Sequence, residues 1–176
     1  MSRQVNTFER GTTRLGTDRP HLIGRPGYFD DVELDPAGGV GKTNSGMEVE
    51  TIVVVNDSGT TLAPCAVVAW KNGFAGTKVG GLNGNLGKGA GVVDPFLTSA
   101  VPNGSQFHLI VKGPTKVLAH DGSITAGLGL VAQASGRVDG YAVDGDADYA
   151  LSYVGTAIEA SAAQDDKIRA VVDFRL

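Results

Sequence analysis

The amino-acid sequence predicts an all-β protein, a small β-barrel or β-sandwich, with an extended N-terminal arm. Segments rich in β-branched residues recur from Glu48 onward at intervals of about ten residues, and none has the apolar period of an amphipathic helix. Glycine makes up 26 of the 176 residues, which suits many short strands joined by tight turns. The final segment, 167–176, alternates apolar and polar residues, as a strand with one buried face does.

The expected strands follow one another with turn residues between them. The first, 48–57, is stopped by the turn signal Asn-Asp-Ser-Gly, and the second, 62–70, contains a proline near its start. Residues 72–91 are interpreted as an irregular Gly-rich insertion with room for a short hairpin at 74–79. The remaining expected elements are strands at 105–113 and 115–122 on either side of Gly113-Pro114, a hairpin at 127–143 around Ser135-Gly136, and strands at 153–161 and 167–176.

The chain divides at residue 46 into an arm, 1–46, and a β-barrel or sandwich body, 47–176. No apolar period persists in residues 1–46, and the segment is too polar to build a core alone. It nevertheless carries two apolar pairs, Leu22-Ile23 and Tyr28-Phe29, which a solvated tail would not need. We therefore expect an arm that becomes ordered against a partner.

Charge is distributed unevenly between the two parts. Residues 1–28 carry five arginines against two acids, a net of +3, and residues 29–176 carry 10 basic and 17 acidic residues, a net of −7, which sum to −4. The arginines are widely spaced, with no lysine cluster or stacking aromatic beside them, so nucleic acid is not expected as a partner. No apolar run reaches the length of a membrane span, and the N-terminus has no signal-peptide core, so the sequence favours a protein made in the cytoplasm.

Three features of the sequence resemble parts of catalytic or binding sites. The run Gly38–Thr43 resembles part of a phosphate-binding loop, but Pro36 stands where the first glycine belongs, so it is interpreted as a loop. The segment 144–148 has carboxylates at calcium-loop positions but lacks the required glycine and glutamate. The single Cys65 lies in an apolar run and is expected to be a buried thiol. The sequence therefore predicts no catalytic residue, no metal site and no cofactor.

Residues 89–99, GAGVVDPFLTS, resemble the uracil-binding loop of trimeric dUTP-hydrolysing enzymes. The further motifs of that family are absent, and Asp94 before Pro95 is more simply the start of a turn. A dUTPase-like nucleotide hydrolase stays open as one alternative function. A β-barrel ligand-binding or glycan-binding accessory module is another.

A longer series of segments resembles the capsid cement, or head decoration, proteins of tailed phages. The segments are VPNGSQFHLIVKGPTKVL at 101–118, ITAGLGLVAQASGRV at 124–138, VGTAIEAS at 154–161 and IRAVVDF at 168–174, and they occur in the same order. The resemblance implies a small β-rich, β-tulip-like body without enzymatic activity that forms a homotrimer. Its implied partner is the major capsid protein.

The function implied by this resemblance is that of a structural virion protein on the outer capsid surface. Such a protein binds where capsomers of the major capsid protein meet and stabilises the expanded shell. The arm would then supply capsid-binding residues, with the apolar pairs filling shallow pockets and the arginines meeting acidic groups. These expected contact residues are Arg10, Arg14, Arg19, Leu22, Ile23, Arg25, Tyr28 and Phe29.

Overall fold

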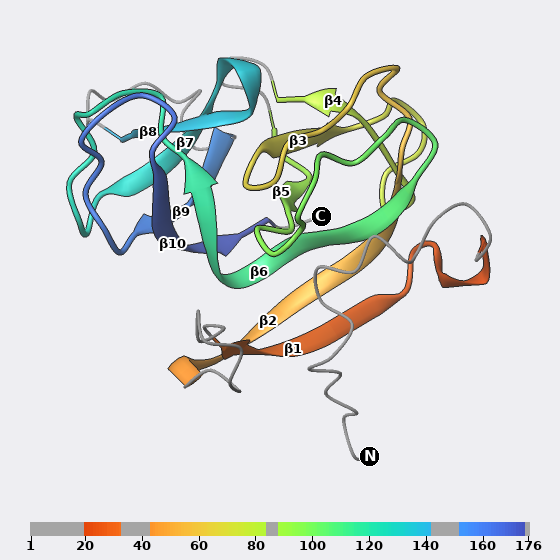
Figure 1. Ribbon diagram of the computed structural model, residues 1–176, viewed down its shortest axis with the longest axis horizontal. Coiled ribbons are helices and arrows are strands. Elements are labelled where there is room, and N and C mark those ends of the chain that lie inside the picture. The colour runs from red at the N-terminus through yellow and green to blue at the C-terminus, as the bar shows by residue number, and fades with distance from the viewer. Residues whose placement is uncertain (1–19, 33–42, 84–87, 142–151, 175–176) are drawn as a thin grey trace.

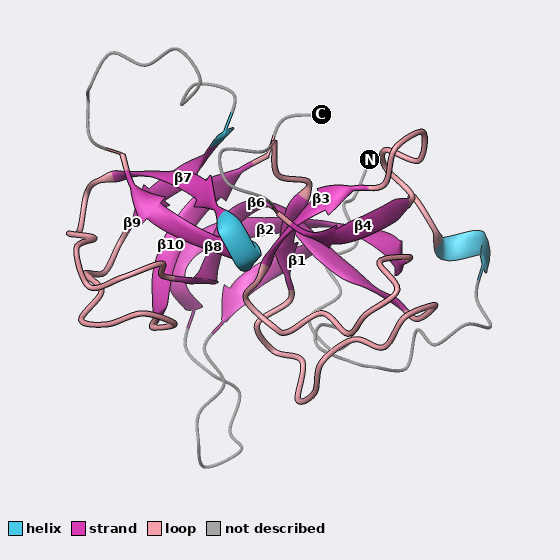
Figure 2. Cartoon of the chain, turned by 90° about the horizontal axis from the view of Figure 1, so that it is seen from above, coloured by secondary structure: helices cyan, strands magenta, loops and turns pink. Residues whose placement is uncertain are grey.

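The computed structural model describes residues 20–32, 43–83, 88–141 and 152–174, and almost all of its regular structure is β-strand (Figures 1 and 2). Ten strands join in one sheet in the order β1-β2-β4-β3-β5-β6-β10-β9-β7-β8. The elements are η2 (Pro20–Leu22), β1 (Pro26–Val32), β2 (Thr43–Asn56), β3 (Val67–Trp70), β4 (Lys78–Leu82), β5 (Gly91–Val93), β6 (Gln106–Leu118), β7 (Gly129–Gln133), η3 (Ala134–Gly136), β8 (Arg137–Gly140), β9 (Tyr153–Ala157) and β10 (Lys167–Asp173). The prediction of an all-β fold is confirmed.

Five of the strands close into a small barrel, which we call the first lobe. β2 pairs with β4, β4 with β3, β3 with β5, β5 with β6, and β6 returns to pair with β2. All these pairings are antiparallel except β2–β4, which is parallel. Because the barrel closes, each of these strands has a partner on both sides, which protects its edges from pairing with other chains.

The other half of the sheet forms a second lobe that shares β6 with the first. β6 pairs with β10, and the order continues through β9 and β7 to β8. β8 then approaches the end of β6 again, because Ala119 bridges Val138 and the His120 N–H donates to the Val138 carbonyl at 2.7 Å. The turn expected around Ser135-Gly136 is confirmed, since η3 joins β7 to β8 and Ser135 has a φ of 63°.

The shared strand β6 bends between the lobes at a glycine. Its first half pairs with β2 and its second half with β10. Gly113 lies at the change with a φ of 103°, and a Cβ there would stand 2.5 Å from the Glu48 carbonyl oxygen. The sequence predicted two strands separated at Gly113-Pro114. The structure has one continuous strand, in which Pro114 lies opposite Val171 without interrupting the register with β10.

Two apolar clusters fill the molecule. One lies in the barrel and includes Val54, Leu62, Val79, Phe107 and Leu109. The other fills the second lobe and extends along the outer side of β2, β5 and β6; its members are Phe29, Val49, Val67, Val92, Ile110, Val117, Ala119, Ile124, Leu130, Ala132, Val138, Val154, Ala157, Ile168, Ala170, Val172 and Phe174. The last strand is alternately buried, as predicted, with Val172 at 0% and Phe174 at 8% exposure.

The described residues of the expected arm, 20–32 and 43–46, are largely part of the sheet. Residues 26–32 form β1, which pairs antiparallel with β2, and the boundary expected at residue 46 falls inside β2. The segment before β1 is also tied to β2, because the Gly24 N–H donates to the Val53 carbonyl at 2.8 Å and the Val53 N–H donates to the Arg25 carbonyl at 3.1 Å. β1 has only seven residues, and two of them are Pro26 and Gly27, so its alternation of apolar and polar side chains is too short to be recognised in the sequence.

Two other segments differ in detail from their expected structure. Within the Gly-rich segment 72–91, residues 78–82 form the regular strand β4, which pairs on both sides within the barrel. The strand expected at 62–70 begins only at Val67. Before it lies a turn in which Cys65 has a φ of 70° and the Ala66 N–H donates to the Ala63 carbonyl, a conformation that Pro64 favours at the preceding position.

Candidate docking surfaces

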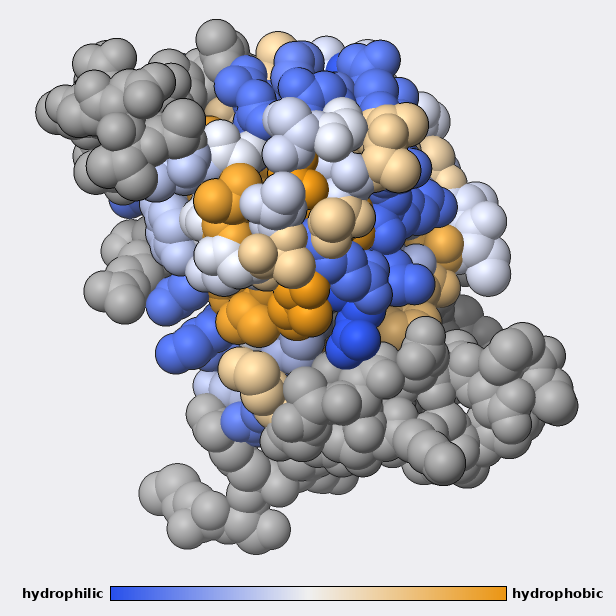
Figure 3. All heavy atoms as spheres, turned by 90° about the vertical axis from the view of Figure 1, so that its left-hand side faces the viewer, coloured by the Kyte–Doolittle hydropathy of each residue, from blue (hydrophilic) through white to orange (hydrophobic). Residues whose placement is uncertain are grey.

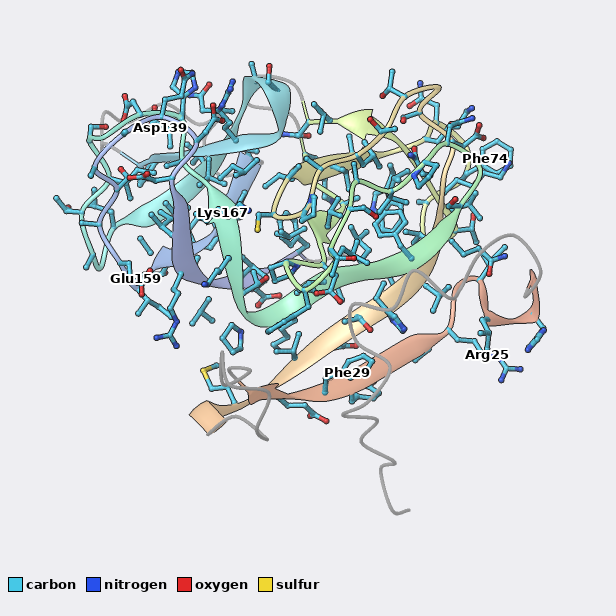
Figure 4. All side chains as sticks on the ribbon, viewed as in Figure 1. Arg25, Phe29, Phe74, Asp139, Glu159 and Lys167 are labelled. Atoms are coloured by element: carbon cyan, nitrogen blue, oxygen red, sulfur yellow. The ribbon has the colours of Figure 1, made fainter. Side chains whose placement is uncertain are left out.

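The described residues expected to bind a capsid differ in their exposure. Arg10, Arg14 and Arg19 lie outside the described residues. Leu22 ends η2 and, like Ile23, is half-buried, whereas Arg25 is exposed. Figure 4 shows Arg25 and Phe29 on the same side of the molecule, along the β1 segment.

Tyr28 and Phe29 lie on opposite faces of β1 because side chains alternate along a strand. Phe29 is 2% exposed, and its ring meets the His108 ring edge-on at a centroid distance of 5.2 Å. Tyr28 is half-buried and its hydroxyl lies 3.5 Å from Glu50 Oε1. Phe29 is therefore a core residue of this chain, and the expectation that it contacts a capsid does not hold in this fold.

His108, on β6, contacts both Phe29 of β1 and Thr51 of β2. It is 8% exposed, and its Nδ1 lies 3.1 Å from the hydroxyl of Thr51, which in turn lies 3.4 Å from the Gly27 carbonyl oxygen. A buried histidine held between a threonine and a phenylalanine is a structural residue. Among the described residues, no group of three or more His, Cys, Asp or Glu side chains could hold a metal ion.

Large apolar side chains are exposed at several separate places on the described surface. They are Met47, Phe74, Leu82, Tyr153 and Ile158. Figure 3 views the second lobe end-on and shows a small group of apolar side chains surrounded by hydrophilic ones. Phe74 lies at the opposite end of the molecule from Asp139 and Glu159 (Figure 4). Small, scattered apolar patches are ordinary on a soluble surface and do not by themselves define a binding site.

Phe74 belongs to a charged turn at the end of the barrel. Lys78 Nζ stands 4.7 Å from the centroid of the Phe74 ring and 3.2 Å from Asp57 Oδ2, and Lys71 Nζ lies 2.9 Å from the same oxygen. The pKa of Asp57 is lowered, first by the side-chain hydrogen bond from Lys71 and then by that from Lys78. Both lysines are thus engaged within the chain by a single carboxylate, and one positive charge of this turn remains in excess.

A second group of cations lies on the outward face of the β6–β10 pair. Lys116 is directly opposite Arg169 in the register, and Lys167 lies two residues before Arg169 on the same face of β10. Lys116 and Lys167 are exposed and Arg169 is half-buried. We call Lys116, Lys167 and Arg169 the β6–β10 basic cluster.

The sequence suggested neither this cluster nor its location. Lys167 and Arg169 alternate with buried residues, which is a recognisable sign of an outward face. Lys116 is about fifty residues away in the chain, and only the antiparallel register brings it across from Arg169. Sequence patterns report the faces of single strands but not which strands become neighbours.

In the segment that resembles a uracil-binding loop, Asp94 stabilises the turn that follows it. Asp94 is fully buried, and its carboxylate accepts a hydrogen bond from the Phe96 N–H at 3.0 Å. The Leu97 N–H also points to the Asp94 carbonyl oxygen. The prediction that Asp94 starts a turn is confirmed.

In the part of the chain that the structure describes, no helix is long and apolar enough to span a membrane. No protein-family model matches the sequence, and no curated protein does. The structure is similar to that of the head fiber gp8.5 N base of bacteriophage phi29, with a TM-score of 0.50 and 13% sequence identity. The similarity covers 70% of this chain and 92% of the phage protein. The two chains therefore share a fold.

Proposed function

We propose that this protein is a structural component of a phage head. It acts as a decoration protein that binds the outer surface of the shell where capsomers of the major capsid protein meet. It works by binding rather than by catalysis and associates with further copies of itself, in a homotrimer.

The single observation that carries this proposal is the fold shared with the phi29 head fiber base. The similarity extends over 92% of the phage chain, so the comparison concerns the whole module and not one hairpin of it. Fold alone does not determine function. The order of the sequence segments that resemble cement proteins supports the same class of protein independently of the fold comparison.

The physical mechanism is multivalent docking. Each copy buries a modest interface, and association of copies raises the effective concentration of the second contact once the first has formed. A protein that binds only the expanded shell stabilises that shell by mass action. The arginines that precede the described residues supply charge for acidic groups of the shell, while the β-lobes provide a rigid body.

The experiment is cosedimentation of the full chain with purified empty heads that lack it, both expanded and unexpanded. We expect saturable binding to expanded heads and a higher temperature of head disruption after binding. If the folded protein fails to bind expanded heads, the proposal is wrong.

A pair of double variants tests the contribution of the arginines. Replacing Arg10 and Arg14 with alanine should weaken binding at least about tenfold, because a loss of only about 1.4 kcal/mol of contact is sufficient. The matched control replaces Lys71 and Lys78, two cations that both already pair with Asp57 of the same chain. Equal weakening by both double variants would show that general charge, and not the N-terminal segment, governs binding.

A further inference from the structure

Two rungs of the β6–β10 pair carry a charged residue on both strands, and the two rungs differ in sign. Lys112 is the register partner of Asp173, so that rung carries one charge of each kind. Lys116 and Arg169 are also partners, but both are cations, a juxtaposition that destabilises an antiparallel pair. Lys167 adds a third cation on the same face of β10. This end of the face therefore favours an external anion.

Among the described residues, no carboxylate forms an ion pair with the β6–β10 basic cluster. The ion pairs that join described residues lie elsewhere, at Asp57 and at Asp165. The carboxylate of Glu159 lies beside the cluster, where it accepts a hydrogen bond from the Arg169 backbone N–H at 3.1 Å. One carboxylate against three cations leaves an excess of positive charge here, on a chain whose net charge is −4.

An exposed apolar side chain lies next to the cluster, at the end of β9. The Ile158 N–H donates to the Arg169 carbonyl at 2.8 Å, so Ile158 stands across from Arg169. Side chains alternate along a strand, and the preceding residue, Ala157, belongs to the core. Ile158 therefore faces outward beside the guanidinium-bearing residue, and it is 39% exposed.

Tyr153 extends the apolar part of the same face. Its hydroxyl lies 3.1 Å from the hydroxyl oxygen of Thr156, and Thr156 is the register partner of the half-buried Val171. Tyr153 is 47% exposed. In Figure 1, β6, β10 and β9 follow one another across the second lobe, in agreement with the strand order. We call the β6–β10 basic cluster together with Tyr153, Ile158 and Val171 the second-lobe face.

The composition of the second-lobe face is typical of a protein interface. Tyrosine and arginine are enriched at such interfaces, and truncating them often costs the most binding energy. A polyanion such as nucleic acid would contact the three cations but would gain little from Ile158 and Val171. The partner that matches both parts of this face is a protein surface that is acidic and partly apolar.

We propose that the second-lobe face docks on an acidic, partly apolar surface of the phage shell. Carboxylates of the shell meet the basic cluster and relieve the repulsion between Lys116 and Arg169, while Tyr153 and Ile158 lose their exposure to water. This inference rests on the proposed function and names the surface of the β-body that carries it, in addition to the N-terminal arginines.

The test is cosedimentation with expanded empty heads, beginning with charge. Replacing Lys116 and Lys167 with glutamine should weaken binding at least about tenfold at roughly 0.05 M salt, and by less at roughly 0.5 M, because salt screens exposed charges. The matched control, Lys71→Gln with Lys78→Gln, changes the net charge equally at lysines that pair with Asp57. This control should weaken binding by no more than about twofold.

A second pair of variants separates a protein surface from a polyanion. Tyr153→Ala with Ile158→Ala removes the exposed apolar side chains and should weaken binding at least about fivefold. The matched control, Phe74→Ala with Leu82→Ala, also removes one aromatic and one aliphatic side chain, of 45% and 44% exposure, but from the barrel. It should leave binding unchanged.

Folding is controlled by thermal unfolding, in which every variant should keep a melting temperature close to that of the original chain. If a variant unfolds, the original chain still answers the question through the reactivity of its lysines. Lys116 and Lys167 should react more slowly with an amine-reactive reagent on heads than in the free protein. Lys71 and Lys78 should react equally in both states.

The outcomes separate this inference from the proposed function. If the original chain binds heads and both second-lobe variants bind as tightly as their controls, the inference is wrong and the proposed function stands. Weaker binding by the charge variant alone would point to a polyanion and reject a protein partner. A changed oligomeric state of the free variants in sedimentation velocity would place this face between copies and also overturn the inference. If the original chain does not bind heads, both fail.

Discussion

Replacing Gly113 with alanine should destabilise the fold, because two separate costs arise at this position that together amount to about 2–5 kcal/mol. The φ of 103° is unfavourable for a residue with a side chain, which costs about 1–2 kcal/mol. The new methyl group would also stand 2.5 Å from the Glu48 carbonyl oxygen and 3.1 Å from the Val49 Cα. These are backbone atoms of β2, which β1 pairs with at this point, so relieving the overlap should cost a further 1–3 kcal/mol or so.

Gly104→Ala is the matched control for this prediction. Gly104 also has a positive φ, 83°, but a Cβ there would meet no heavy atom within 4 Å. Both substitutions restrict the unfolded chain equally, which offsets about 0.4–1 kcal/mol in each variant. The difference between the two variants therefore isolates the close approach of β6 to β2, and it should be about 1–3 kcal/mol.

Urea unfolding followed by circular dichroism measures this difference. With a slope of about 1–3 kcal/mol per molar, the Gly113→Ala midpoint should lie about 1 M below that of Gly104→Ala. Equal midpoints would refute the reasoning, because they would mean that β6 is not held against β2 at its bend. A change in slope as well as midpoint would mean that unfolding is no longer two-state or that the compactness of the denatured state has changed.

Two further predictions concern Phe29, which the structure buries against expectation, and Cys65, which is buried as expected. Phe29→Ala should lower the free energy of unfolding of the free protein by about 3–5 kcal/mol, because burial is lost and a cavity forms, and Tyr28→Ala should lower it by about 1 kcal/mol or less. Thermal unfolding measures both effects, and equally small effects would contradict the burial of Phe29 and favour a role in binding a partner. Burial raises the pKa of Cys65 from 9.0 to about 11, so the unfolded thiol ionises first, and the free energy of unfolding should fall as pH rises through that range. Cys65→Ala should lack this fall in denaturant titrations; the same pH dependence in both proteins would contradict the assignment.

The sequence alone determined the features that depend on neighbouring residues. The alternation in 167–174 identified the last strand and its buried side, and the turn residues at 134–136 identified the β7–β8 hairpin. Cys65 was correctly expected to be buried, and Asp94 to start a turn. Each of these is a local signal, in which the side-chain period or the turn conformation is encoded within a few residues.

Tertiary structure alone decided which strands became partners, and with that the candidate surfaces. β1 and β4 are strands because β2 pairs with both of them, although their own patterns are short and rich in glycine. Gly113-Pro114 suggested a break, yet β6 continues through it because β2 supports one half and β10 the other. Pairing between distant segments leaves no periodic trace in either segment. For the same reason, the opposition of Lys116 and Arg169 and the burial of Phe29 could be found only in the folded chain.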